Sequence, residues 1–521
     1  MSSPHRRAVA LLAGCLALAA CGSTVPRGVS EPDANLYVPV VTIGSPPSAG
    51  QQTTSSETAP STSALPTAGG ATGAGPATVA TRGASSSPLT QPSPPGGRPS
   101  ATASNPTMPA SGPGWNEKDV FVGVPTENDA SSAIAGLGLS FNPGNAAHDV
   151  AAEVKALNAA GGVLGHQIVP VYHDNSTASI ESNAAVVANQ NCTYFSQDRR
   201  VAEVINGLSD LALPPCFAPL HIPDVEVGSV IDGTADYQKY GPYLWTTEFP
   251  NVDQLADVEV DQLYAEGYFG KWNPHTSSAL GGGPVKVGIL EPATATGSEL
   301  TARLAKDVAA KGIQVAQTFA YTDSALSYSG QMAAAELRFA AAGVTHVINI
   351  PPVAAAMLFF IDTAQAQGYH FRYAFTSYDL PNQAVADLPH AQLAGAMGVG
   401  FDPGYDAIPA VTPKPNAAAT ACDRTQRRAG VANSTPLEIG NARDYCDALN
   451  LFVQAATAGG GFTADDIAAG MASVGRRFVP GGAFGSKLSA SDHSMPAYVR
   501  DLFWTPSCTC FAYRGGLHPM G

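Results

Sequence analysis

The stretch AAHDVAAEVKALNAAGGVLGHQIVPVYHD, Ala146 to Asp174, decides the fold. Its first half predicts an amphipathic helix, because Val150, Val154 and Leu157 recur at helical spacing between polar residues. The glycine pair at 161–162 can adopt the positive φ that ends a helix. The second half of the stretch is rich in β-branched residues and predicts a strand.

That strand, over residues 167–172, has an earlier counterpart in VFVGV at 120–124. The order strand, helix, strand indicates the start of a parallel α/β sheet. Further strands are expected in a first series and then in a second one, at 201–205 and 225–227, and at 285–290, 313–319, 346–350, 371–375 and 396–401. Asp174 is expected to cap a helix running to about Asn189, and a helix is expected at 211–219.

The segment NAAGGVLGHQI, Asn158–Ile168, resembles the opening of the Leu/Ile/Val-binding family of periplasmic binding proteins. The resemblance implies an α/β protein with the type I periplasmic-binding fold, in which each of two lobes is a mostly parallel sheet flanked by helices. Three crossovers would join the lobes, near 246–250, 401–405 and 485–500. It also implies a monomeric solute-binding protein of an ABC-type importer, without enzymatic activity, cofactor or metal.

On this scheme each lobe is built from two parts of the chain. Lobe 1 would comprise 115–248 and 403–493, and lobe 2 would comprise 249–402 and the closing strands of 494–521. Two segments are longer than the family usually has, a Gly/Pro-rich loop at 270–284 and an irregular insertion at 405–437.

The first 20 residues form a processing signal, with basic residues at 5–7 and an apolar run at 8–20 that is too short to span a bilayer. The run ends in LAACG, which resembles the bacterial lipoprotein cleavage motif and implies lipidation of Cys21. The protein would then be anchored by its acyl chains to the outer face of the cytoplasmic membrane. An ordinary secretory signal with an incidental cysteine remains the alternative.

Residues 21–114 consist mainly of Ser, Thr, Pro, Gly and Ala. Such a segment cannot bury enough apolar surface to offset chain entropy, so we expect a disordered tether between the lipid and the folded body.

The formal net charge of −15 disfavours nucleic acid and anionic membrane surfaces as partners. Apart from Cys15 and Cys21, six cysteines remain, and their even number in an exported protein favours disulfides. Six cysteines allow fifteen pairings. The local pairs Cys192–Cys216 and Cys422–Cys446 are preferred, while the state of Cys508 and Cys510 stays open.

Ligands of open α/β sheets bind beyond the carboxyl ends of the strands. Small and hydroxyl-bearing residues follow two of the expected strands, at 206–210 and 228–230. The family that the sequence resembles binds its ligand at the corresponding strand ends. The family's first loop, here 126–132, closes over the ligand. The candidate ligand-binding residues are Asn128, Leu208, Ser209, Asp210, Gly228, Ser229, Val230, Thr294, Thr296, Asn349, Tyr378 and Asp379. As alternatives, Ser209 and Asp210 cap the next helix, and 126–132 is an ordinary polar loop.

The sequence departs from amino-acid-specific members of the family at one position. Those members place an acidic side chain at the end of a second-lobe strand to pair with the ligand ammonium. The matching position here is Tyr378, and a one-residue shift would bring Asp379 there instead. If the alignment holds as written, the ligand lacks a free α-amino group or Asp210 supplies the charge. The sequence leaves four ligand classes as alternatives, namely an amino acid, an amide, an aromatic acid and a polyol.

Sequence motifs for other functions are missing. The chain has no HExxH, GxSxG or GxxxxGK motif, and no GxGxxG that opens a helix after a strand. An unusual hydrolase on this scaffold stays open. The main alternative to a transport receptor is a ligand-sensing or scaffold lipoprotein with the same fold, because fold does not determine function.

Overall fold

The computed structural model of the 521-residue chain describes residues 109–140, 142–208, 211–228, 230–322, 324, 327–350 and 354–521. These residues belong to one compact unit. The expected signal segment, the lipidation site Cys21 and the tether up to residue 108 lie outside the described residues. Within the described ranges, the helices are all too short or too polar to cross a membrane.

Lobe 1 contains a five-stranded parallel sheet with the order β2-β1-β3-β4-β5. Its strands are β1 (Asp119–Glu127), β2 (Gln167–Asn175), β3 (Glu203–Asn206), β4 (Asp224–Glu226) and β5 (Leu244–Thr246). β1 and β3 are adjacent, and the strand order runs in opposite directions from that pair. Their carboxyl ends are therefore where a ligand site is expected.

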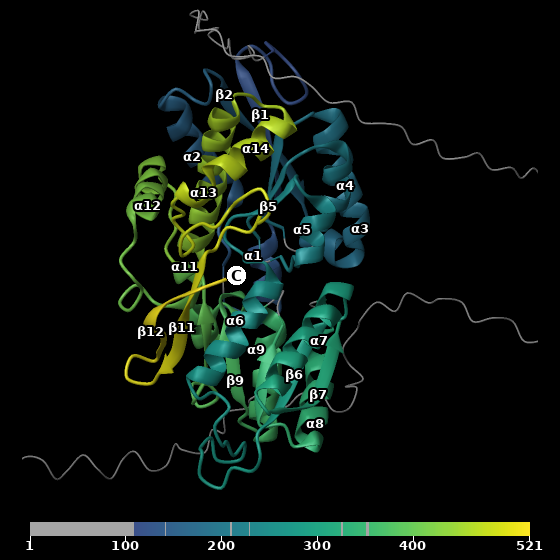
Figure 1. The fold of residues 1–521 in the computed structure, drawn as a ribbon, viewed down its shortest axis with the longest axis vertical. Coiled ribbons are helices and arrows are strands. Elements are labelled where there is room, and N and C mark those ends of the chain that lie inside the picture. The colour runs from purple at the N-terminus through teal and green to yellow at the C-terminus, as the bar shows by residue number, and fades with distance from the viewer. Residues whose placement is uncertain are drawn as a thin grey trace, which may run out of the picture. The chain divides into compact units, whose positions relative to one another are not determined.

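Helices cover both faces of this sheet, as Figure 1 shows. One face packs against α2 (Ala146–Ala159), α13 (Pro436–Gly459) and α14 (Ala464–Val474). The other packs against α3 (Thr177–Thr193) and α4 (Pro214–Phe217), with α5 (Thr234–Tyr240) leading to β5. The short α1 (Ala130–Gly136) follows β1. Valine and isoleucine on the strands pack against both helix layers, so the sheet contributes to an apolar core on each face.

Lobe 2 contains a seven-stranded sheet with the order β12-β11-β10-β9-β8-β6-β7. Its strands are β6 (Lys286–Pro292), β7 (Gln314–Tyr321), β8 (His346–Asn349), β9 (Arg372–Thr376), β10 (Met397–Gly400), β11 (Tyr498–Thr505) and β12 (Cys510–Pro519). The first five are parallel, and β11 and β12 close the sheet in antiparallel orientation.

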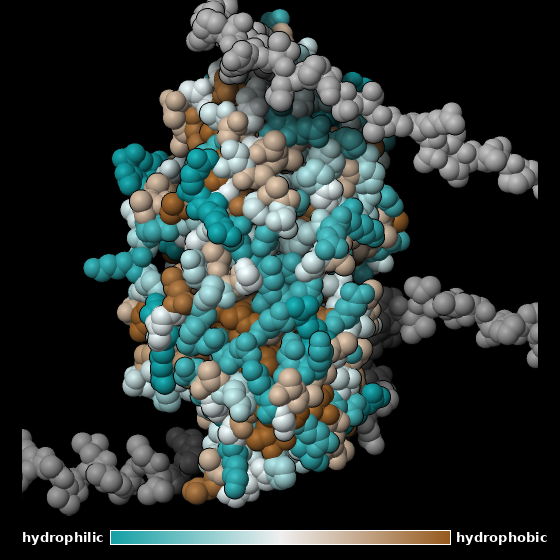
Figure 2. All heavy atoms as spheres, viewed as in Figure 1, coloured by the Kyte–Doolittle hydropathy of each residue, from teal (hydrophilic) through white to brown (hydrophobic). Residues whose placement is uncertain are grey.

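The helices of lobe 2 are again divided between the two faces. α6 (Val252–Ala265) and α7 (Ala295–Ala310) share one apolar core, and α8 (Tyr328–Ala342) and α9 (Ala354–Gln367) share the other. α10 (Pro381–Asp387) follows the turn after β9. The outer surfaces of α6 and α7 are joined by ion pairs, Arg303 with Asp257 at 2.5 Å and Lys311 with Asp261 at 2.7 Å. Figure 2 shows hydrophilic residues across this face, with hydrophobic residues in small groups.

The chain passes between the sheets after β5, after β10 and before β11. The first and third passages lie side by side, because Thr246 and Ser494 form a parallel bridge. The second passage continues into α11 (Pro403–Asp406). The expected two-lobed α/β architecture with three crossovers is therefore confirmed.

Three local expectations were wrong. The segment 405–437 is not simply irregular, because Asn416 caps a regular helix, α12 (Ala417–Ala429), and Gly430 ends it with φ +81°. Ser176 rather than Asp174 caps α3, and its hydroxyl accepts from the Ser179 N–H at 3.2 Å. The helix expected at 211–219 is reduced to α4 and a 3-10 turn at 218–220 by its prolines.

The described part of the tether segment is not free of the body. Gly112 pairs with Trp115, and Gly114 bridges to Val201 of lobe 1. The folded body therefore begins a few residues before 115. Disulfides join Cys192 to Cys216, Cys422 to Cys446 and Cys508 to Cys510.

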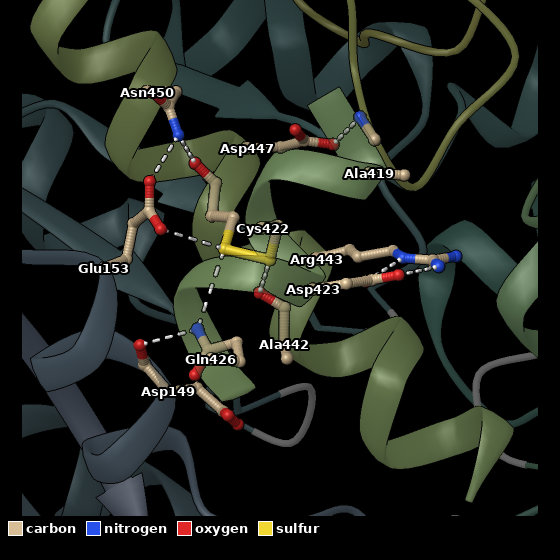
Figure 3. Close-up of a disulfide and its surroundings, with 12 residues drawn as sticks. Asp149, Glu153, Ala419, Cys422, Asp423, Gln426, Ala442, Arg443, Asp447 and Asn450 are labelled. Atoms are coloured by element: carbon tan, nitrogen blue, oxygen red, sulfur yellow. Dashed lines mark hydrogen bonds and ion pairs between the residues drawn. A yellow bond between two sulfur atoms is a disulfide. The ribbon is translucent and has the colours of Figure 1, made fainter. Parts of the chain in front are cut away.

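The Cys422–Cys446 disulfide fastens α12 to α13 (Figure 3). Arg443 of α13 reinforces this attachment, because its guanidinium donates two hydrogen bonds of 2.9 Å to Asp423 of α12. The inserted helix is thus held against lobe 1 by a covalent bond and a bidentate ion pair.

Candidate functional site

A cavity of about 250 Å³ lies at the carboxyl ends of β1, β3 and β4, facing the turn after β9. Both lobes contribute to its wall. The lining residues are Glu127, Ala130, Ile134, Pro143, Gly144, Ala146, Gly207, Leu208, Val227, Gly228, Ala354, Tyr378, Leu380, Tyr405, Leu437, Asn441, Asp444 and Tyr445.

The strand end after β3 is shaped by Asn206 and Gly207. The side-chain oxygen of Asn206 accepts from the N–H of Leu208 at 3.0 Å and so holds the turn. A Cβ at Gly207 would lie 1.9 Å from the hydroxyl of Tyr445 on α13. Glycine at this position therefore allows α13 to approach the strand end and bring Tyr445 to the cavity wall.

Lobe 2 contributes Tyr378, which lies in a 3-10 turn directly after β9. Its hydroxyl donates to the backbone carbonyl of Val230 in lobe 1 at 2.7 Å. Its ring lies against Phe249 and Phe401, with centroid distances of 5.0 and 5.3 Å. Burial raises the pKa of Tyr378 well above its usual value, so the phenol keeps its proton and stays a donor.

Helix α13 supplies the polar part of the wall. The Tyr405 hydroxyl lies within hydrogen-bond distance of Asn441 Oδ1, at 2.6 Å, and of a carboxylate oxygen of Asp444. Burial, together with the charge of Asp402, raises the pKa of Asp444 well above its usual value. The Asn441 amide donates to the Pro143 carbonyl at 2.7 Å and fixes the loop before α2.

The chemistry of the wall suits a small, partly apolar molecule. Its aliphatic side chains include Ile134, Leu208 and Leu437, and its polar groups include the carboxyls of Glu127 and Asp444. Lysine and arginine do not occur among the described lining residues. A ligand that donates hydrogen bonds or carries an ammonium group would meet acceptors here.

Of the predicted ligand-binding residues, Leu208, Gly228 and Tyr378 meet at this cavity. Val230 lies beside them, with its carbonyl engaged by Tyr378. Ser209, Asp210 and Ser229 lie outside the described residues.

The remaining predicted residues make contacts of their own, and none is among the described residues of the wall. Asn128 donates to Asp174 at 2.7 Å, and Thr294 caps α7 by accepting from the Gly297 N–H at 3.0 Å. Thr296 is half-buried in the first turn of the same helix. Asn349 donates to Asp379 at 2.7 Å.

Asp379 is held inside lobe 2 by its own turn. Its second carboxylate oxygen accepts from the Thr376 N–H at 2.8 Å, in a capping box. Burial raises the pKa of this carboxyl to about 6, although the hydrogen bonds from Thr376 and Asn349 oppose that rise.

The wall residues of α13 and Tyr405 were not predicted from the sequence. A signal existed in α13, where Asn441, Asp444 and Tyr445 recur at helical spacing. That pattern marks one helix face, but it does not show which distant strand end the face meets.

Comparison with solved structures identifies the same architecture elsewhere. A branched-chain amino acid ABC transporter protein from Thermus thermophilus with bound valine superposes with a TM-score of 0.55 at 16% identity, covering 77% of this chain and 96% of that one. An ABC transporter substrate-binding protein from Desulfitobacterium hafniense in complex with Leu gives 0.51 at 15% identity, covering 76% and 100%. A possible leucine/isoleucine/valine-binding protein from Rhodopirellula baltica gives 0.55 at 13% identity, covering 78% and 98%.

No protein-family model and no curated protein matches the sequence. The likeness to the solved structures shows the fold, which is that of the type I periplasmic binding proteins.

Proposed function

We propose that this chain is an extracytoplasmic solute-binding protein of the Leu/Ile/Val-binding type, which closes on a small polar ligand and delivers it to an ABC permease. The observation that carries the proposal is the cavity of about 250 Å³ whose wall is shared by strand ends of lobe 1 and the Tyr378 turn of lobe 2. A cavity with walls on two lobes can bury a ligand when the lobes close and release it when they open.

The ligand class follows from the wall. Aliphatic groups beside the acceptors of Glu127 and Asp444 suit an amino acid, an amino-acid amide or a related molecule with an N–H or ammonium group. The structural neighbours with bound valine and Leu are consistent with this choice. If the sequence alignment holds, Tyr378 stands where amino-acid-specific proteins of this type place a carboxylate, so an uncharged amide is included in the proposal.

Location is the second part of the proposal. We infer that residues 1–20 direct export and that a lipid on Cys21 anchors the protein at the outer face of the cytoplasmic membrane. The cleavage-motif resemblance of residues 18–22 supports this anchor. A lipid and a long tether would keep the binding lobes near the permease.

Thermal unfolding of the purified full chain tests the binding function. The panel consists of amino acids, their amides, small organic acids and sugars. A ligand present at about 100 times its dissociation constant adds about 2.7 kcal/mol to the free energy of unfolding, which gives a clear shift in Tm. A shift restricted to amino acids or amides supports the proposal.

A shift produced only by sugars or acids would overturn the ligand class while keeping the receptor function. Absence of any shift, together with no retained small molecule by native mass spectrometry, would contradict the receptor function itself. The scaffold alternative would then take its place.

A further inference from the structure

Three buried carboxyl groups meet where the lobes are joined. Glu248 follows β5 at the first crossover, Asp402 follows β10 at the second, and Asp444 lies on α13. One oxygen from each of the three lies within 4.8 Å of the others. Their relative exposures are 0%, 0% and 1%, so solvent does not stabilise their charges.

The hydrogen bonds of the described residues leave this group short of donors. Asp402 accepts from the Gly404 N–H at 2.6 Å, and one oxygen of Asp444 contacts the Tyr405 hydroxyl. The other oxygen of Asp402, the other oxygen of Asp444 and both oxygens of Glu248 accept no hydrogen bond there. Buried polar groups normally find a partner, so four orphan oxygens in one place call for an explanation.

Two of these orphan oxygens lie beside Gly482. A Cβ at that residue would lie 2.5 Å from Glu248 Oε2 and 2.9 Å from Asp444 Oδ1. The fully buried Glu248 side chain therefore ends beside the Asp444 carboxyl, and among the described residues no donor reaches either of these two oxygens. This is an observation separate from the presence of three acids in one cluster.

Nearby positive charge does not balance the group. Arg443 is the neighbouring cation, but its guanidinium donates two hydrogen bonds to Asp423 rather than to the cluster (Figure 3). A fourth acid, Asp447, lies beside Glu248 and accepts from the N–H groups of Gly481 and Gly482 at 2.6 and 2.9 Å. Burying several carboxylates with so little compensation is costly unless a cation or protons neutralise them.

We propose that Glu248, Asp402 and Asp444 bind a divalent cation, with Ca²⁺ preferred. An all-oxygen donor set of carboxylates suits a hard cation, and Ca²⁺ tolerates irregular coordination better than Mg²⁺, which keeps several waters. Zn²⁺ is less suitable because it favours histidine and cysteine ligands. The sequence contained no metal motif because the three ligands are far apart along the chain.

A cation at this position would affect how the two lobes are connected. Its ligands come from two of the three crossovers and from a helix of lobe 1, so a bound cation would stabilise one arrangement of the connecting segments. Asp444 also lines the solute cavity, which places the cation beside the bound ligand. This site does not depend on the proposed transport function, since a cation would be held in the absence of solute.

The test uses the full chain, stripped with a chelator and then given CaCl₂ or MgCl₂ alone. We expect a saturable rise in Tm with Ca²⁺ and a smaller one with Mg²⁺. Tb³⁺ should bind in place of Ca²⁺ and give tyrosine-sensitised luminescence, because Tyr405 contacts Asp444. Added Ca²⁺ should quench that luminescence.

The diagnostic variant is Glu248→Gln, which keeps the shape of the side chain and removes its charge. It should weaken Ca²⁺ binding by about tenfold or more. Mutation of a residue that only hydrogen-bonds a metal ligand already lowers metal affinity by about that factor, and Glu248 would be a ligand itself. It should also raise the Tm of the metal-free protein, which distinguishes lost binding from misfolding. The matched control is Glu336→Gln, a buried glutamate in α8 whose two oxygens also lack donors, and it should keep the Ca²⁺ response.

An unchanged Tm with Ca²⁺ and no sensitised Tb³⁺ signal in the wild-type protein would overturn the proposal. A Ca²⁺-induced rise in Tm that is as large in Glu248→Gln as in the wild-type protein would also overturn the proposal. Either result would mean that protons shared with Asp447 neutralise the cluster instead.

Discussion

The hydroxyl of Tyr378 donates to the carbonyl of Val230 at 2.7 Å, and this hydrogen bond joins the turn after β9 in lobe 2 to the strand end after β4 in lobe 1. Both groups are buried, so water does not replace the contact when it is lost. The bond lies at the wall of the solute cavity and links the structure of the cavity to the closure of the two lobes.

The variant Tyr378→Phe tests the role of this bond. It removes the donor and keeps the ring against Phe249 and Phe401. We expect a loss of about 1–2 kcal/mol of stability, since a buried carbonyl is left without its partner. We also expect weaker ligand binding, measured by isothermal titration calorimetry.

The control for that variant is Tyr373→Phe, which removes a buried hydroxyl bonded to Gln392 within lobe 2. It should lower the stability and leave the ligand affinity unchanged. Equal affinity losses in both variants would show that Tyr378 acts only through the stability of lobe 2.

The buried Glu259 of α6 is expected to give the protein an unusual dependence of stability on pH. Burial, together with the charge of Asp379, raises its pKa from 4.5 to about 8, and Tyr268 also faces it. The folded state therefore holds a proton that the unfolded chain releases, so this group makes the protein less stable as pH rises from about 4.5 to about 8. The loss is about 1.4 kcal/mol per pH unit within that window.

The variant Glu259→Gln removes this titration and keeps the size of the side chain. Its stability relative to the wild-type protein, measured by denaturant unfolding, should grow with pH across the same window. Glu299→Gln, at an exposed position of α7, controls for the charge change. If the difference in unfolding free energy between Glu259→Gln and the wild-type protein stays constant with pH, the raised pKa of Glu259 is contradicted.

Gly207 is predicted to be irreplaceable by a larger residue because of its distance to Tyr445. In Gly207→Ala the new Cβ would lie 1.9 Å from the Tyr445 hydroxyl and 2.9 Å from the adjoining ring carbon, so the ring must move. We expect a loss of about 1–3 kcal/mol of stability, as in other overpacked sites, and a disturbed cavity wall.

The matched control is Gly330→Ala in α8, where a Cβ meets no atom within 4 Å. It should raise the stability by about 0.5–1 kcal/mol, because alanine loses less entropy than glycine in a helix. Comparable stability of the two variants in thermal unfolding would refute the steric role of Gly207.

The anchor is tested by Cys21→Ala in cells that express the full chain. Loss of the acylated thiol should move the protein from the membrane fraction to the soluble fraction, because one or two acyl chains are the expected attachment. Cys15→Ala, in the same apolar run, should leave the protein in the membrane fraction. Membrane retention of the Cys21 variant would point to another attachment.

The regular elements of the fold could be predicted from local patterns. The expected helix before Gly161 is α2. This helix has apolar periodicity and ends at a glycine pair, so it is determined by its own residues. Helix α12 was missed because its surface is largely polar and its attachment depends on a disulfide to α13.

The cavity could be predicted only from the strand-end rule. That rule led to Leu208 and Gly228, which are close in the sequence to the strands they follow. It could not identify Tyr405, Asn441 and Tyr445, which reach the same wall from the return section of the chain. Asn349 and Asp379 were proposed from the family resemblance, and in the structure they bond to each other.

The cavity shared by the two lobes is the proposed solute site. Titration calorimetry of Ala130→Trp with the best ligand of the panel shows whether the solute binds there, because Ala130 is a half-buried wall residue at the start of α1. The indole should fill the cavity and abolish binding while the Tm of the ligand-free protein stays near that of the wild type. Ala135→Trp, on an exposed position of the same helix, should bind as the wild type does. Unchanged affinity in Ala130→Trp would show that the solute binds outside this cavity.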